Sequence, residues 1–289
     1  SFLGAFSSFM AVLLYLKGNP DLFFIKNSFY KDSSTGFFIN RTVFSLFLLF
    51  CLVGSLQYLK KYNNENNKDN NKIFFKKIYV RIFVIFICIG IITSSSRIGN
   101  FLLLLTLFYY LIQSYFINNQ QNTSFRNIVF LILFFDILIV GYYFGTDQLI
   151  QRFLFLNEEF LISKTEDQNL SRLQIINFGL ENIKKFYLFG YGPGSFETLF
   201  QIDYSNTEEN FANHAHSSLI QFIGEFGFIG FTLLILSVFK FFLHKIFYDK
   251  LNILLLVFLF VLLSFDFSLH IPLIQILFII FFILNKKIE

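Results

Sequence analysis

The sequence predicts an all-α, polytopic integral membrane protein with about eight transmembrane helices. Hydrophobic residues make up 55% of the chain and charged residues only 15%, which is too apolar for an ordinary soluble domain of this length. The apolar residues also occur in long runs separated by polar loops, as in helical membrane proteins. We expect a single membrane domain over residues 1–289.

Eight apolar runs are the predicted spans: 2–16, 42–59, 78–93, 98–117, 127–144, 217–240, 251–267 and 271–285. Several are nearer to about 15 residues than to 20, so they must recruit flanking residues or thin the bilayer. Ser1 opens the chain inside an apolar run, without an initiator Met. We therefore expect an N-terminally truncated chain, the C-terminal part of a longer protein with further spans.

Lysine and arginine in the loops predict the orientation. The loop 60–81 carries seven cations, whereas the short turn 94–97 carries only Arg97. The positive-inside rule places 60–81 in the cytoplasm, so 17–41, the turn at Arg97, the long segment 145–216 and the corner 266–271 face outward. The net charge of +4 follows from these loop cations and implies no nucleic-acid partner.

The most informative segment is Asn213–Ser218, which reads Asn-His-Ala-His-Ser-Ser and holds two of the four histidines. It lies at the start of a predicted membrane helix whose first turns carry Gln221 and Glu225 on one face. Polar side chains at membrane depth are costly and mark functional sites. We therefore expect chemistry at this boundary.

The external segment 145–216 contains a predicted amphipathic helix over 171–188, with apolar residues at three- and four-residue steps. Ser171 is a candidate N-cap, and Gly190 follows as a stop. The helix either lies on the lipid surface or packs over the spans. Arg172 in its first turn opposes the helix dipole. It is either a solvated surface cation or, together with the helix-start amides, a holder of an anion such as phosphate.

Three further features leave alternatives open. The run Gly190–Ser195 has three glycines in five residues and suits either a tight turn or an anion-binding nest. His214 and His216 lack a third metal ligand at useful spacing, and the acidic run 203–209 lacks the central glycine of a calcium loop. Cys51 and Cys88 fall inside predicted spans, as packing residues do. We expect neither a metal nor a cofactor.

Four cationic or titratable residues map to the external face: Arg41, Arg97, Arg172 and His216. Snorkelling to lipid phosphate accounts for any single arginine. If the four converge, they suit a diphosphate substrate, because arginine grips phosphate oxygens in bidentate fashion and histidine is a base near neutral pH.

Five motifs, in this order, resemble the bacterial O-antigen ligase and polymerase superfamily of polytopic membrane glycosyltransferases. They are Thr35–Arg41, Ser96-Arg97-x-Gly99, Ser171-Arg172-Leu173 leading to Phe189–Phe196, His214–Ser217 through Glu225-x-Gly227-x-x-Gly230, and Ser264–Phe267 leading to Ile271-Pro272. The resemblance implies a GT-C-like helical fold. It also implies glycan transfer from an undecaprenyl-diphosphate carrier to a hydroxyl acceptor, at the outer face of the bacterial inner membrane, without a metal or nucleotide sugar.

The resemblance also implies residue roles. Arg97 and Arg172 would hold the carrier diphosphate, His216 would take the proton of the acceptor hydroxyl, and Arg41 would make a weaker contact. The acceptor would be a second glycan in a polymerase, a lipid A core in a ligase, or a protein, and we favour the polymerase slightly. Two departures are Ser217, where the family often has Asn, and the small number of spans.

Two rival classes remain. A transporter or channel for an anionic lipid-linked sugar would place ionisable residues near the bilayer midplane and show repeated halves. Only Asp136 is a charged residue deep in a predicted span, and the sequence has no internal repeat. A non-catalytic scaffold would have no need of His216 beside cations.

Overall fold

The computed structural model describes residues 1–20, 33–64, 71–116, 172–203, 212–246 and 250–284, together with four helical positions between 127 and 134. All regular structure in these ranges is helical. The chain divides into two compact units, Ser1–Asp147 and Gln148–Glu289, which are described separately. The single membrane domain over 1–289 stays a prediction.

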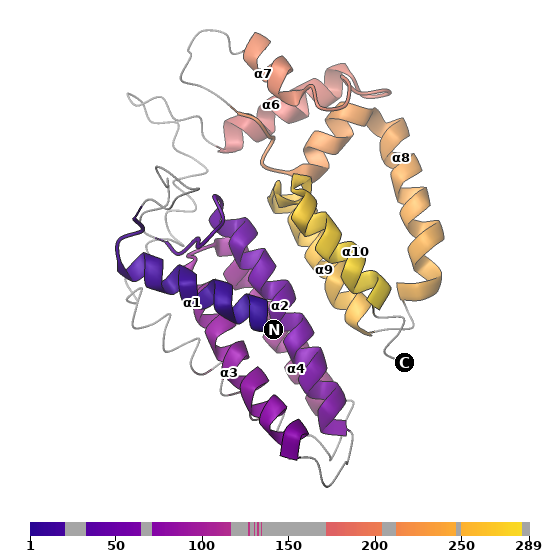
Figure 1. Ribbon diagram of the computed structural model, residues 1–289. Coiled ribbons are helices and arrows are strands. Elements are labelled where there is room, and N and C mark those ends of the chain that lie inside the picture. The colour runs from indigo at the N-terminus through magenta and orange to yellow at the C-terminus, as the bar shows by residue number, and fades with distance from the viewer. Residues whose placement is uncertain are drawn as a thin grey trace. The chain divides into compact units, whose positions relative to one another are not determined.

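The described residues of unit 1 include four complete helices (Figure 1): α1 Phe2–Leu16, α2 Arg41–Asn64, α3 Asn71–Thr93 and α4 Arg97–Phe116. Helix α3 packs against α1 and α2, and α4 packs mainly against α2. Helix α1 presents small residues to this bundle: Gly4, Ala5, Ser7, Ser8 and Ala11 are buried. A side chain on Gly4 or Gly90 would collide with Cys51 or Ser8, respectively. Small residues thus allow close helix approach, as is common in membrane bundles.

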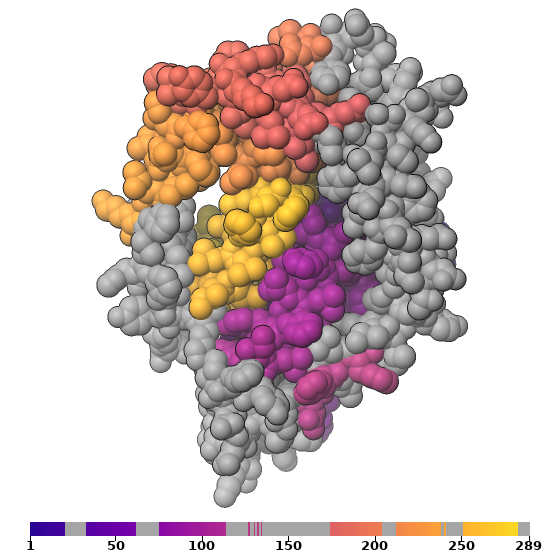
Figure 2. Space-filling model, turned by 180° about the vertical axis from the view of Figure 1, so that it is seen from behind, coloured from indigo at the N-terminus to yellow at the C-terminus, as the bar shows by residue number. Residues whose placement is uncertain are grey.

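Unit 2 contains α6 Arg172–Lys185, α7 Phe196–Asp203, α8 Ser218–Ile246, α9 Lys250–Phe265, the 3-10 helix η1 Ser268–His270 and α10 Pro272–Leu284. Helix α8 packs against α6, α7 and α9. From behind, Figure 2 shows α6 and α7 gathered at one end of this unit. Both helices belong to the segment 145–216, which the sequence predicted to be external.

Helix α8 is broken at Gly227, whose φ of 66° and ψ of −178° are non-helical. Figure 1 shows the two parts running in different directions. Glycine reaches such angles without the clash that a Cβ atom brings. The predicted span over 217–240 thus corresponds to an apolar helix that contains a break at Gly227, which the sequence pattern did not predict.

The apolar helices support a helical membrane protein but not a count of eight spans. Within the described residues, two helical stretches are long and apolar enough to cross a membrane, Arg41–Lys61 and Ser218–Ser237, and the second contains the break. Shorter apolar helices cover Phe2–Leu16, Arg97–Gln113, Leu251–Phe265 and Pro272–Phe282. The predicted span 127–144 lies outside the described residues except for four helical positions. The GT-C-like arrangement stays a prediction.

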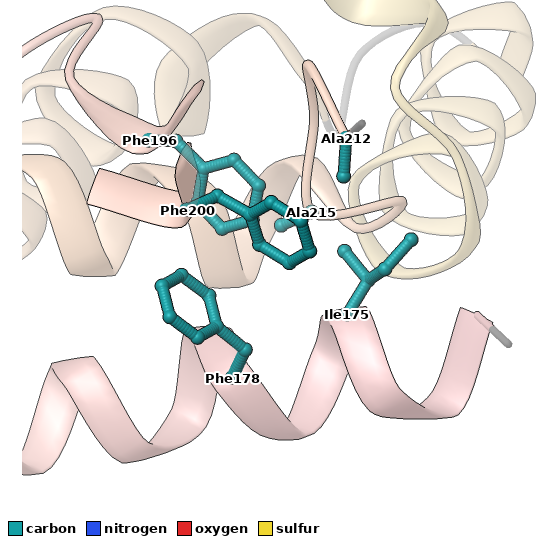
Figure 3. Close-up of a cluster of buried hydrophobic side chains, with 6 residues drawn as sticks. All are labelled: Ile175, Phe178, Phe196, Phe200, Ala212 and Ala215. Atoms are coloured by element: carbon teal, nitrogen blue, oxygen red, sulfur yellow. The ribbon is translucent and has the colours of Figure 1, made fainter. Parts of the chain in front are cut away.

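The predicted amphipathic helix is present as α6, although Ser171 lies outside the described residues. Its apolar face packs inward (Figure 3): Ile175 and Phe178 join Phe196 and Phe200 of α7 and two alanines of the following segment, Ala212 and Ala215. Of the two alternatives for its apolar face, the structure shows packing over α8, because Gly179 approaches Ile220 closely.

Candidate functional site

The segment 212–217 leads into α8 and carries both histidines of the motif. Ala215 is fully buried, and its flanking residues His214 and His216 are half-buried. His216 has a φ of 55°, in the left-handed region. A non-glycine residue is uncommon there, and such conformations cluster at functional sites. The local chain therefore anchors itself at Ala215 and presents an imidazole on each side of it.

Serine hydroxyls tie this segment to the end of α9. The Ser218 hydroxyl donates to the Asp266 carbonyl at 2.7 Å, and the Ser218 amide donates to the same oxygen at 3.2 Å. The Ser217 hydroxyl donates to the Leu263 carbonyl at 3.3 Å and accepts from the amide of Ile220. Ser217 thus caps α8 and holds it against α9, an orienting task that a small hydroxyl residue performs.

The rings of His214, His216, Phe267 and His270 form a cluster. The imidazole of His214 stacks on Phe267 at 5.2 Å and on His270 at 4.9 Å between ring centroids. His216 meets Phe267 edge-on at 5.7 Å. Burial, followed by the nearby charge of His214, lowers the pKa of His270, while Glu225 acts in the opposite direction. The cluster thus favours a neutral imidazole at His270.

A buried amide–carboxylate pair lies one turn further into α8. The side-chain nitrogen of Gln221 donates to Glu225 Oε1 at 2.9 Å. The side-chain oxygen of Gln221 accepts a longer bond, 3.4 Å, from the amide of Ala215. Both side chains are buried. The expectation that they share one face is confirmed, and the pair connects the helix to the residue between the two histidines.

The Gly190–Ser195 run forms a turn that docks on α8. The amide of Tyr191 donates to the Gly224 carbonyl at 2.9 Å, and the amide of Gly192 donates to the Glu225 carbonyl at 3.0 Å. Since these two amides are occupied, the structure favours the tight turn over an anion-binding nest there. Burial and Glu225 raise the pKa of Tyr191, so its phenol stays protonated at neutral pH.

Helix α6 starts beside the histidine segment. Arg172 is its first residue, and Ile175, in the same turn, shares a buried cluster with Ala215 (Figure 3). The backbone at Arg172 is thereby placed close to the turn that bears His216. The first turn has no acidic residue, so the free amides of the helix start face no carboxylate of their own turn.

In unit 1, Arg41 and Arg97 hold equivalent positions at two neighbouring helix starts. The Asn40 side chain accepts from the Thr42 amide at 2.7 Å, and the Ser96 hydroxyl accepts from the Gly99 amide at 3.2 Å. The Ser96 hydroxyl also donates to the Thr42 hydroxyl at 3.4 Å. Each arginine therefore follows directly after a cap, and the two helix N-termini touch.

The same end of unit 1 also holds the described residues of 17–41, another segment predicted to be external. The Ser34 amide donates to the Thr93 carbonyl at 3.0 Å, and the two hydroxyls are 2.8 Å apart. The Asn19 side chain donates to the Ser33 carbonyl at 2.9 Å. Residues 17–20, 33–41 and 93–97 thus share one end, as an alternating topology requires.

The predicted site residues form two groups. The helix starts that carry Arg41 and Arg97 touch in unit 1, and the start of α6 lies beside the His216 segment in unit 2. Convergence of all four stays a prediction. The described residues contain no group of three or more histidine, cysteine or carboxylate side chains that could hold a metal ion. The acidic run 204–209 lies outside the described residues.

A family model described as O-antigen ligase (Wzy_C) matches residues 82–235, more than half of the chain. The chain belongs to the O-antigen ligase family. The matched region includes Arg97, Arg172, His216 and the break at Gly227. No curated protein and no solved structure matches the chain.

Membership confirms the resemblance drawn from the five motifs. It supports an O-antigen ligase or polymerase type of function, a glycan-transferring enzyme and a membrane protein whose partners are a lipid-linked glycan and an acceptor. The apolar helices agree with this.

Sequence reasoning missed the contribution of His270 and Tyr191. For His270, the sequence offered one signal. The residue lies in the corner 266–271, which the loop charges predict to be on the same side as His214 and His216. The sequence could not predict that His270 stacks on His214, because 56 residues separate the two histidines and only packing brings them together.

Proposed function

We propose that the protein transfers a glycan from an undecaprenyl-diphosphate carrier to a hydroxyl acceptor at the outer face of the bacterial inner membrane. The reaction serves surface polysaccharide assembly, as a polymerase or a ligase. It uses neither a metal ion nor a nucleotide sugar. The observation that carries the proposal is the His216 imidazole, held half-buried at a left-handed position in the matched region.

The proposed chemistry is a single displacement. The acceptor hydroxyl attacks the anomeric carbon while its proton moves to His216. The bond between that carbon and the diphosphate oxygen breaks, and the electron pair leaves with undecaprenyl diphosphate. The proton later passes from His216 to the diphosphate or to water, which restores the neutral imidazole.

Arginine charge stabilises the departing diphosphate in this scheme. Arg97 and Arg172 are proposed as its main partners, and Arg41 as a weaker one. Support comes from the capped helix starts at Arg41 and Arg97, where positive helix ends add to the guanidinium charge. Helix α6 begins at Arg172, beside the His216 segment.

The test compares His216→Ala with wild type in a deletion strain, using the full-length gene and matched membrane expression. Surface polysaccharide is resolved on a gel. We expect loss of long chains and accumulation of carrier-linked units. Asn213→Ala, an exposed neighbour, is the matched control and should keep the wild-type ladder. An unchanged ladder in His216→Ala would remove its role as base.

The residual pattern separates the subclasses. Single-repeat decoration of the core indicates a polymerase, and a core with no glycan indicates a ligase. A deletion strain without any phenotype would instead favour a transporter or a scaffold.

A further inference from the structure

The segment Phe186–Phe189, which follows α6, exposes four large apolar side chains in succession. Their exposed fractions are 43% for Phe186, 54% for Tyr187, 46% for Leu188 and 75% for Phe189. The run thus forms a contiguous apolar surface rather than the scattered apolar residues of an ordinary soluble surface.

Backbone hydrogen bonds hold this segment at the break in α8. The amide of Phe228 donates to the Tyr187 carbonyl at 2.9 Å, and the amide of Ile229 donates to the Leu188 carbonyl at 3.3 Å. These are the first amides after Gly227, which a helix start leaves without intrahelical partners. The exposed run is therefore fixed to the first turn of the second part of α8.

The second part of α8 starts directly after Gly227 and continues the apolar candidate span to Ser237. Its surface near the start is apolar and exposed at Phe228, Ile229 and Leu233. Phe186–Phe189 is therefore held at the break in a candidate membrane span, beside the exposed apolar start of its second part. Two exposed lysines, Lys184 and Lys185, precede it at the end of α6.

We propose that Phe186–Phe189 inserts into the interfacial region of the outer leaflet and anchors the α6 end of the external segment to the bilayer. Aromatic side chains concentrate at membrane interfaces, where an apolar ring lies at the boundary between the headgroups and the acyl chains. The apolar face of α6 is occupied by packing on α7 and α8, so the lipid contact belongs to the segment that follows it. This anchor is independent of the proposed transfer reaction.

Single-tryptophan fluorescence tests the anchor, since these 289 residues contain no tryptophan. The whole chain carrying Phe189→Trp is placed in nanodiscs at one copy per disc, with lipids brominated at the upper acyl chain. We expect about a twofold loss of emission relative to unbrominated lipid, because a ring at the interface faces the brominated chains. Thr198→Trp, at an exposed position of α7, is the matched control and should show no loss.

Absence of quenching at position 189 would overturn the proposal. The proposal would also fail if the emission were blue-shifted only with two copies per disc and bromine did not quench it. That result would show that a second copy of the chain covers this surface. Tyr187→Trp supplies a second probe of the same surface. If both variants are folded and neither tryptophan is quenched, this segment does not contact lipid.

Discussion

Gln221 donates a hydrogen bond of 2.9 Å to Glu225 one helical turn later, and both side chains are buried at the start of α8. The side-chain oxygen of Gln221 accepts a hydrogen bond from the backbone amide of Ala215, which lies between His214 and His216. A buried carboxylate is thus linked through an amide to the backbone that presents the proposed base. From these two hydrogen bonds we infer that Gln221 positions the segment that carries His216.

One single variant of Gln221 and one double variant that exchanges Gln221 and Glu225 test that role. Gln221→Leu removes both bonds and leaves a buried carboxylate without its donor, so we expect at least about a tenfold fall in kcat with little change in KM. The double variant Gln221→Glu with Glu225→Gln retains an acceptor toward Ala215 and a donor between the pair, and should recover most of the rate. The measurement is transfer kinetics with a lipid-linked donor. A double variant as slow as Gln221→Leu would contradict positioning through these bonds.

Gly227 tests the break in α8. A Cβ atom there would lie 2.3 Å from the Leu188 carbonyl oxygen, in addition to the strain of a positive φ. We expect Gly227→Ala to cost about 3 kcal/mol, seen as a lower melting temperature in detergent. Gly194→Ala is the matched control. It has a similar φ but no atom within 4 Å of the added carbon, so only about 1 kcal/mol of strain is expected. Equal losses in both variants would show that the contact with Leu188 is unimportant.

Arg97 tests diphosphate binding at the paired helix starts. Arg97→Ala should raise the KM for the lipid-diphosphate donor by about tenfold or more, since a charged hydrogen-bonding partner is lost. Arg97→Lys should recover only part of this affinity, because an ammonium cannot bind two phosphate oxygens in the same planar way. Lys76→Ala, an exposed cation near the opposite end of α3, should leave the KM unchanged. Full activity of Arg97→Lys would rule out bidentate recognition.

The pH dependence of stability tests the histidine cluster. The pKa of His270 is lowered in the folded protein, first by burial and then by His214. The unfolded chain therefore binds a proton at higher pH than the native protein does. Stability should fall as the pH drops below the ordinary histidine value of about 6.5. His270→Gln should weaken this slope in thermal unfolding measured across acidic pH. An identical slope in the variant would contradict the assigned cause.

Local patterns predicted much of this protein. Period and polarity placed α6 within a few residues, and apolar runs located most of the helices. The shared face of Gln221 and Glu225 followed from helical geometry. Loop charges grouped residues 17–41 with the turn at Arg97, and the hydrogen bonds of Ser34 and Ser96 place these segments at one end of unit 1. The helices and the shared face depend on residues near one another in the chain, and the grouping of the loops depends on their charge.

Only the tertiary structure decided the break at Gly227 and the ring contacts of His270. The glycines between 224 and 230 suit a continuous helix as well as a broken one. The break is stabilised because Tyr187, Leu188, Tyr191 and Gly192 supply hydrogen-bond partners for the freed backbone groups of α8. Likewise, His270 stacks on His214 where the backbone of Asp266 accepts hydrogen bonds from the start of α8. Both depend on contacts between residues far apart in sequence, which periodicity and motif spacing do not encode.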